Sequence, residues 1–128
     1  MKYLCIGYFD PTRMDALPEG KAEALMRQCP PHMDTLYGTG KVQLVAGADN
    51  ESRFLRPAGG QVSVSDGPAP SPNARIGCVF ILEAADWQEA VQLASLHPTT
   101  QVAGGEELGW YTEVRPVHYF YPDEAQGS

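Results

Sequence analysis

Residues 2–9 carry apolar side chains at nearly every position. Odd positions such as Tyr3 and Cys5 would share one face of a strand, and the residues between them the other face. A strand that is apolar on both faces is covered on both sides. The pattern therefore predicts a buried first strand, which Asp10-Pro11-Thr12 ends.

A helical period replaces this pattern after Pro18, a residue that suits the first position of a helix. Apolar side chains recur there at steps of three and four, at Ala22, Leu25, Met26, Cys29, Met33, Leu36 and Tyr37. Pro30-Pro31 interrupts the stripe, because proline removes a hydrogen-bond donor and clashes with the preceding turn. We expect one sharply kinked helix or two short helices in phase, ending at Gly38 and Gly40.

Strands are predicted next at 41–48, 52–57 and 61–65, the last two joined by a turn at Gly59-Gly60. Residues 66–73 are predicted to form a loop, and residues 75–83 are the strongest strand pattern in the chain.

A second helix begins with a capping box, in which Asp86 caps the helix and Glu89 reaches back. Its expected buried stripe is Trp87, Ala90, Val91 and Ala94. Pro98 stops this helix, residues 101–108 are predicted as loop, and residues 109–120 as the last strand.

This order predicts an α+β fold with both helices on one face of an antiparallel sheet, most simply a ferredoxin-like split βαβ. The other face should carry aromatic and aliphatic residues, with candidates Tyr8, Phe80 or Val79, Trp110 or Tyr111, and Tyr119. An apolar face needs a cover. We therefore expect a homodimer whose two sheets pair across a two-fold axis. Residues 1–121 should form a single domain, and residues 122–128 a flexible C-terminal tail.

Charge and composition exclude several classes of partner. A formal net charge of −7 argues against nucleic acid, which requires a positive surface. No apolar run approaches the ~20 residues that cross a bilayer, so no membrane partner is expected. Cys5, Cys29 and Cys78 are odd in number, widely spaced and set among apolar residues, which favours free thiols and a cytoplasmic location. No metal-ligand spacing is present, and no metal is expected.

Five segments carry a family resemblance as an ordered set: the opening Lys2–Tyr8, Gly40–Gly47, Asp66-Gly67-Pro68, Gly77–Glu83 and Glu113–Val117. Together they resemble the YCII-related family, in particular its branch named for Asp-Gly-Pro-Phe. The resemblance implies a dimeric α+β barrel. The chain departs from the branch in the loop after the turn. Ala69 stands in place of Phe, and Ser71, Asn73 and Ala74 stand where Glu and Lys are usual.

The resemblance also supplies two functional leads. The wider family includes a dehydrochlorinase that acts on a chlorinated hydroquinone, with a His and an Asp proposed for proton transfer. Other members of the branch resemble partners of alternative sigma factors. Since the family often has a His on the first helix, the resemblance points to His32.

His32 and Asp66 are the candidate catalytic pair. Histidine suits general acid–base chemistry near neutral pH, and a carboxylate can orient an imidazole or act as a base. Each residue also has a structural explanation. His32 can be an exposed or capping residue beside a kink, and Asp66 can hydrogen-bond its own turn.

The remaining candidates have stronger structural explanations. His97 near the end of a helix interacts with the helix dipole, and His118 suits sheet packing or a dimer contact. Arg115 either binds an anionic ligand or forms an ion pair. Tyr8, Phe80 and Trp110, with other aromatics, either line an apolar pocket or belong to the core.

Two functions remain open. The first is a proton-transfer enzyme (a lyase, isomerase or cyclase) that acts without a cofactor on a small, largely apolar or aromatic molecule through His32 and Asp66. The second is a non-catalytic ligand-binding or protein-interaction module, tied to sigma-factor regulation. Whether His32 and Asp66 point into one cavity would discriminate between them.

Overall fold

The computed structural model describes residues 1–48, 52–65 and 74–121. Its main element is a four-stranded antiparallel sheet with the order β2-β5-β1-β6. These strands are β2 (Val42–Gly47), β5 (Arg75–Glu83), β1 (Lys2–Phe9) and β6 (Tyr111–Pro116). The order is that of the ferredoxin-like fold, so the predicted α+β class is confirmed.

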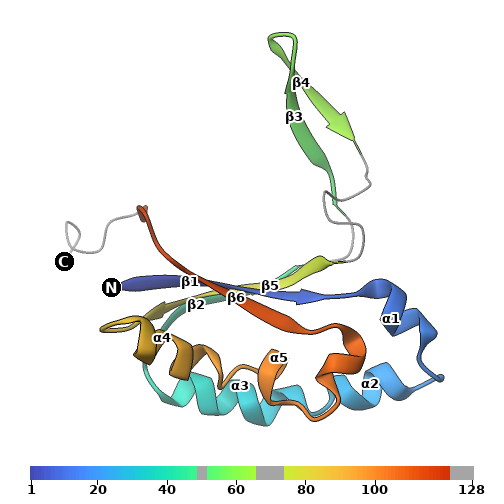
Figure 1. Cartoon of the computed structure of the whole chain (residues 1–128), viewed down its shortest axis with the longest axis vertical. Coiled ribbons are helices and arrows are strands. Elements are labelled where there is room, and N and C mark those ends of the chain that lie inside the picture. Colours follow the sequence, from blue (N-terminus) through green and yellow to red (C-terminus); the bar gives the residue numbers. More distant parts are fainter. Residues whose placement is uncertain (49–51, 66–73, 122–128) are drawn as a thin grey trace.

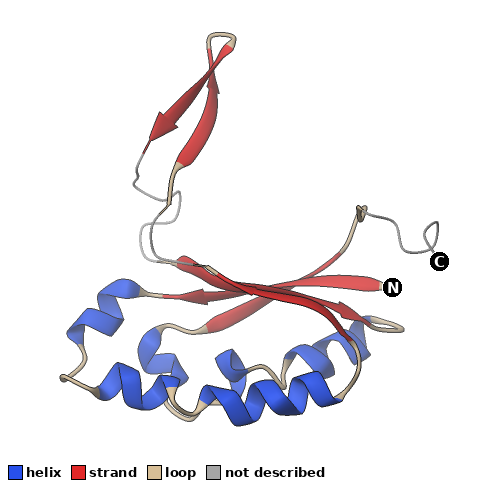
Figure 2. Ribbon diagram, turned by 180° about the vertical axis from the view of Figure 1, so that it is seen from behind, coloured by secondary structure: helices blue, strands red, loops and turns tan. Residues whose placement is uncertain are grey.

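The helices lie on one side of this sheet (Figure 1, Figure 2). They are α1 (Pro11–Ala16), α2 (Lys21–Met26), α3 (Cys29–Gly38), α4 (Trp87–Ala94) and α5 (Pro98–Gln101), with a 3-10 turn, η1, at Gly105–Leu108. In the part of the chain that is described, no helix is long and apolar enough to span a membrane.

The register of the central strands decides which side chains face the helices. Cys5 pairs with Phe80, and Tyr3 pairs with Leu82, so all four point to the helical side. They form the core together with Leu36 of α3 and Ala90 and Ala94 of α4. Phe80 therefore belongs to the helical face, and its alternative, Val79, lies on the open face opposite Ile6.

The predicted break in the first helical region occurs, but it precedes the double proline. The chain leaves the helix at Arg27-Gln28, and Pro30 and Pro31 occupy the first turn of α3. Proline is tolerated there because the first N–H groups of a helix have no intrahelical acceptor. Two short helices are thus the correct alternative.

Helix α1 is an element that the sequence reading missed. Asp10 ends β1 as predicted, but its Oδ1 then accepts hydrogen bonds from the Thr12 and Arg13 N–H groups, at 2.9 and 3.4 Å. Pro11 follows as the first helical residue. The same residues that break a strand therefore cap a helix. Helix α5, which begins at the predicted stop Pro98, was also missed, and the predicted loop 101–108 contains η1.

The capping box of α4 is present. The Glu89 N–H donates to Asp86 Oδ1 at 2.9 Å, and Glu89 Oε1 accepts from the Ala85 N–H at 3.0 Å.

Strands β3 (Phe54–Ala58) and β4 (Gln61–Ser65) pair as predicted, but they form a separate two-stranded sheet. Neither strand pairs with the central strands of the main sheet. The reason is that β5 pairs with β1 on one edge and β2 on the other, and β1 pairs with β5 and β6. The hairpin extends away from the sheet on the side opposite the helices (Figure 1). Asp66 and the predicted tail, 122–128, lie outside the described residues.

Candidate functional site

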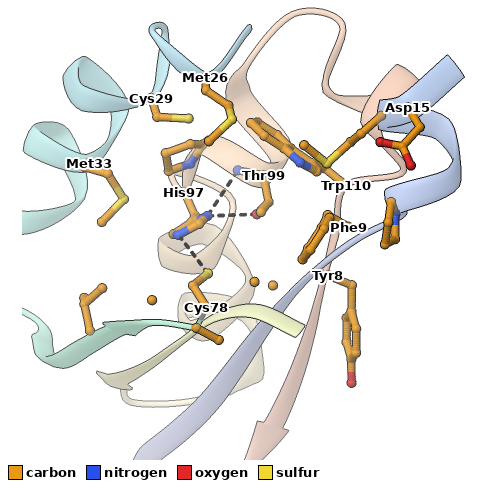
Figure 3. A pocket seen from close by; sticks show the side chains of 18 residues that line it. Tyr8, Phe9, Asp15, Met26, Cys29, Met33, Cys78, His97, Thr99 and Trp110 are labelled. Atoms are coloured by element: carbon orange, nitrogen blue, oxygen red, sulfur yellow. Dashed lines mark hydrogen bonds between the residues drawn. The ribbon is translucent and has the colours of Figure 1, made fainter. Parts of the chain in front are cut away.

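A cavity of about 460 Å³ lies between the helical face of the sheet and the helices α1, α2, α3 and α5. Its lining is largely apolar and rich in sulfur, including Met14, Met26, Met33, Cys29, Phe9 and Trp110. Four polar residues reach it as well: Asp15, Cys78, His97 and Thr99 (Figure 3). This size, with an apolar wall and few polar groups, is typical of a small-molecule site.

His97 is held in the cavity wall by its place between two helices. It precedes Pro98, the first residue of α5, and caps this short helix. The Thr99 N–H donates to His97 Nδ1 at 3.1 Å, and the Thr99 hydroxyl lies 2.9 Å from the same nitrogen. The imidazole stacks on Phe80 with a centroid distance of 4.6 Å and an interplanar angle of 5°. The ring is therefore held at Nδ1 and along one face.

This cap determines the tautomer of the ring. Because Nδ1 accepts a backbone N–H, the neutral imidazole carries its proton on Nε2. Nε2 lies 3.6 Å from Cys78 Sγ, so its proton is directed toward a weak sulfur acceptor. A ligand oxygen that entered here would be a stronger acceptor than the sulfur.

Burial favours the uncharged forms of both His97 and Cys78. His97 is only 5% exposed, and burial lowers its pKa from 6.5 to about 4. Burial raises the pKa of the Cys78 thiol, and a hydrogen bond from the Gly7 backbone only partly offsets this rise. At neutral pH the pair is therefore an uncharged imidazole beside an uncharged thiol. The ring can donate a hydrogen bond, but its Nδ1 lone pair is already engaged and it is a poor base.

Gly7 makes room for this arrangement. A Cβ at Gly7 would lie 2.6 Å from Cys78 Sγ and 3.3 Å from Thr99 Cγ2. Gly7 pairs with Cys78 on β5 and with Thr112 on β6, and the Thr112 hydroxyl is hydrogen-bonded to that of Thr99. The absence of a side chain on the central strand lets these polar groups converge.

Of the predicted catalytic residues, His32 is described and Asp66 is not. His32 is half-buried on α3, and it is not among the described residues that line the cavity, although Cys29 and Met33 of the same helix are. Asp66 lies outside the described residues, so their pairing remains a prediction.

The predicted binding residues occupy different positions. Trp110 lines the cavity, and Phe80 lies beneath His97 in the core. Tyr8 contributes to the lining, but its ring points away from the cavity (Figure 3). This ring stacks on Tyr111 at 4.7 Å. Arg115 pairs in register with Leu4 and shares its open sheet face, away from the cavity.

Sequence reasoning missed the role of His97, Cys78 and Asp15. One local signal was available: a histidine directly before Pro-Thr can accept the N–H two residues later and so cap a new helix. Cys78 could also be placed on the helical face, because it is two residues before Phe80 on the same strand.

Comparisons with known proteins identify the family to which this chain belongs. The YCII-related domain matches residues 1–115. No curated protein matches this chain significantly. Among solved structures, the chain is similar to 5-chloro-2-hydroxyhydroquinone dehydrochlorinase (TftG) from Burkholderia phenoliruptrix AC1100, in complex with 2,5-dihydroxybenzoquinone. The identity is 17%, the TM-score is 0.48, and the match covers 94% of this chain and 96% of that one. Since the domain match extends over most of the sequence, the chain belongs to the YCII-related family.

Proposed function

We propose that this protein is an enzyme that binds a small, largely apolar or aromatic molecule in the cavity and moves a proton on it without a cofactor. The observation that carries the proposal is the His97 side chain. It is a buried, neutral ring with its Nε2–H directed toward a weak acceptor, in a largely apolar wall. Pockets that combine a strongly shifted pKa with a few converging polar groups are frequently functional.

His97 would act as a hydrogen-bond donor to a ligand oxygen. Negative charge that develops on a carbonyl or phenol oxygen during proton abstraction is stabilised most by a fixed donor in a dry site. The stack on Phe80 and the Thr99 cap hold that donor in place before the ligand arrives. A neutral imidazole serves this purpose without a second charge in the cavity.

Asp15 would accept the proton. It lies on α1 and is the one carboxylate among the described lining residues. Removal of a proton next to a carbonyl or phenol begins isomerase, lyase and cyclase reactions alike. The proposal therefore specifies proton abstraction and covers all three reaction classes.

The test measures the rate at which the protein exchanges ligand protons for deuterium in D2O. NMR monitors this rate for a panel of 1,3-dicarbonyl compounds and hydroxylated arenes. Exchange by the wild type should fall about 10²–10³-fold in His97→Ala, the range found for loss of one oxyanion donor. Asp15→Asn should lose about 10²–10⁴-fold. His32→Ala, which leaves the described lining intact, should exchange at the wild-type rate.

Two results would change the assignment. A large loss in His32→Ala and Asp66→Asn, with His97→Ala unaffected, would move the chemistry to the pair predicted from the sequence. Binding without catalysed exchange by the wild type would instead support a non-catalytic ligand-binding module.

We also propose that the protein is a homodimer that pairs the open faces of its sheets. Leu4, Ile6, Leu44, Val79 and Tyr111 share this face by register, together with Ile81, which is only 8% exposed, and the charged Glu113 and Arg115. Leu44 is 40% exposed and Tyr111 50%, and none of the described helices covers them. A second sheet would remove this apolar area from water.

A further inference from the structure

The β3–β4 hairpin has one entirely apolar face. Leu55 pairs with Val64 and Pro57 with Val62, and directly paired residues point to the same side of a ribbon. Leu55 and Val62 are each 65% exposed, and Val64 is 62% exposed. The opposite face is mostly polar, with Arg56 against Ser63.

The hairpin is well specified by its own sequence but lacks a cover for this face. Gly59 and Gly60 both have positive φ, 59° and 81°, as the tightest hairpin turns require. An isolated two-stranded hairpin is nevertheless marginal in water. Three large apolar side chains on one exposed face thus indicate a binding surface rather than a self-sufficient element.

A matching surface exists on the same side of the molecule. The hairpin projects from the side of the main sheet that the helices leave open (Figure 1, Figure 2). The centre of that open face is apolar, with Leu4, Ile6, Leu44, Val79 and Ile81, although Ile81 is only 8% exposed and β6 adds the charged Glu113 and Arg115. Each copy of the chain therefore presents an apolar ribbon and an apolar sheet to the same region of space.

We infer that the hairpin is an arm, and that its apolar face packs on a second copy of this chain at the margin of that copy's open sheet face. The inference builds on the proposed homodimer. It assigns the hairpin a role that the pairing of sheets alone does not give it. A two-fold axis makes the exchange reciprocal, so each chain holds the other.

Charge is compatible with another copy of this chain as the partner. Residues 52–65 contain Arg53 and Arg56 and no carboxylate, whereas the whole chain has a net charge of −7. The formal charge of residues 52–65 is therefore +2, and that of the rest of the chain is −9. A second copy of this chain is thus an acidic protein, to which a formally positive arm is attracted.

The area of the contact also favours the arm. Four strands about 4.8 Å apart and about six residues long present roughly 400 Å², so two stacked sheets bury roughly 800 Å² in total. A stable interface buries about 1,600 Å². Two arms of about 10 by 17 Å would add roughly 700 Å², counting both surfaces of each contact, and bring the total near that value.

The test is sedimentation equilibrium of the full chain from 1 to 100 µM, with two matched double variants. Leu55→Asp/Val62→Asp places two charges on the apolar face. Gln61→Asp/Ser63→Asp places the same two charges on the opposite face, at two positions that are also exposed. The first should raise the dimer dissociation constant at least about 100-fold, because four apolar side chains per dimer lose their burial. The second should change it less than about threefold, and circular dichroism should show both variants folded.

A photo-crosslink tests the contact without relying on a destabilising variant. Benzoylphenylalanine in place of Leu55, in a mixture of 15N-labelled and unlabelled chains, should link heavy to light copies at peptides from β1, β2, β5 or β6. Crosslinks confined to one chain would overturn the inference.

The remaining outcomes separate this inference from the proposals on which it builds. A wild-type dimer that Leu55→Asp/Val62→Asp does not weaken would remove the arm and leave the sheet pairing. A wild type that is monomeric at 100 µM would remove both. Neither result bears on the proposed function of the cavity, which is tested separately by deuterium exchange into a ligand.

Discussion

The buried imidazole of His97 should make the protein lose stability steeply as the pH falls below neutrality. Burial lowers its pKa from 6.5 in the unfolded chain to about 4 in the folded one. Between these values the unfolded state binds a proton that the folded state does not, so protonation favours unfolding. The stabilising difference is fully present above about pH 6.5 and is lost as the pH falls toward 4.

The magnitude follows from this pKa change. One pH unit over which the two states differ by one proton changes the free energy of unfolding by about 1.4 kcal/mol. The whole window from 6.5 to about 4 corresponds to about 3 kcal/mol. Between pH 7 and pH 5 the loss from His97 alone is about 2 kcal/mol. This is a large share of the roughly 5–15 kcal/mol that holds a typical domain folded.

Urea denaturation at pH 7 and pH 5, at one protein concentration, measures this loss. His97→Gln removes the titrating ring, and although it is less stable at pH 7, it should lose about 2 kcal/mol less than the wild type on going to pH 5. His32→Gln is the matched control, because it removes a histidine outside the cavity lining and should keep the steep fall that His97 produces. If the wild type and His97→Gln lost the same free energy between the two pH values, the reasoning about the buried neutral ring would be refuted.

Two further changes test the local structure. Gly7→Ala should cost about 1–3 kcal/mol, because its Cβ would meet Cys78 Sγ at 2.6 Å, whereas Gly47→Ala, whose nearest neighbour is a backbone oxygen at 4.0 Å, should be nearly neutral. Equal shifts of the urea midpoint in the two alanine variants would contradict this account of Gly7. Asp86→Ala should cost about 1 kcal/mol by removing the cap of α4, and Asp86→Asn, which can still accept the Glu89 N–H, should restore most of it. Thermal or urea unfolding measures both, and an Asp86→Ala variant as stable as the wild type would be inconsistent with the cap.

Much of the sheet could be predicted because its signals are local. The predicted first strand, residues 2–9, and the predicted strong strand, residues 75–83, coincide with β1 and β5. Both are apolar on two faces, and each pairs on both edges within the sheet. The capping box at Asp86 likewise fixed the start of α4, because side chain and backbone lie within one turn.

The place of the β3–β4 hairpin could not be obtained in this way. Gly59-Gly60 and the flanking alternation specify which two segments pair. They do not specify whether the ribbon joins a sheet. The central strands β1 and β5 each pair on both sides, so the ribbon cannot lie between them, and it does not pair with the edge strands β2 or β6 either. Alternation therefore predicts a ribbon, and only the complete topology shows that it stands apart.

The candidate site was harder still, because its walls come from distant parts of the chain. One cavity is lined by residues from five segments, although more than a hundred positions separate the first from the last: Gly7, Met33, Cys78, His97 and Trp110. When each residue is considered only within its own segment, the pattern assigns it to a core strand, to the apolar stripe of a helix or to the end of a helix. No pattern within a single segment reports that these side chains surround an open volume.

His97 shows why the structural and functional readings of a residue are not alternatives. The sequence assigned it an interaction with the dipole at the end of a helix, but its structural role is the N-cap of the next helix, α5. The backbone N–H that makes it a cap also occupies Nδ1, and so sends the ring proton to Nε2, on the cavity side. The core packing that buries it also keeps it neutral at physiological pH. A histidine that neither capped a helix nor packed in the core would titrate and rotate freely, and could not offer one fixed donor to a ligand.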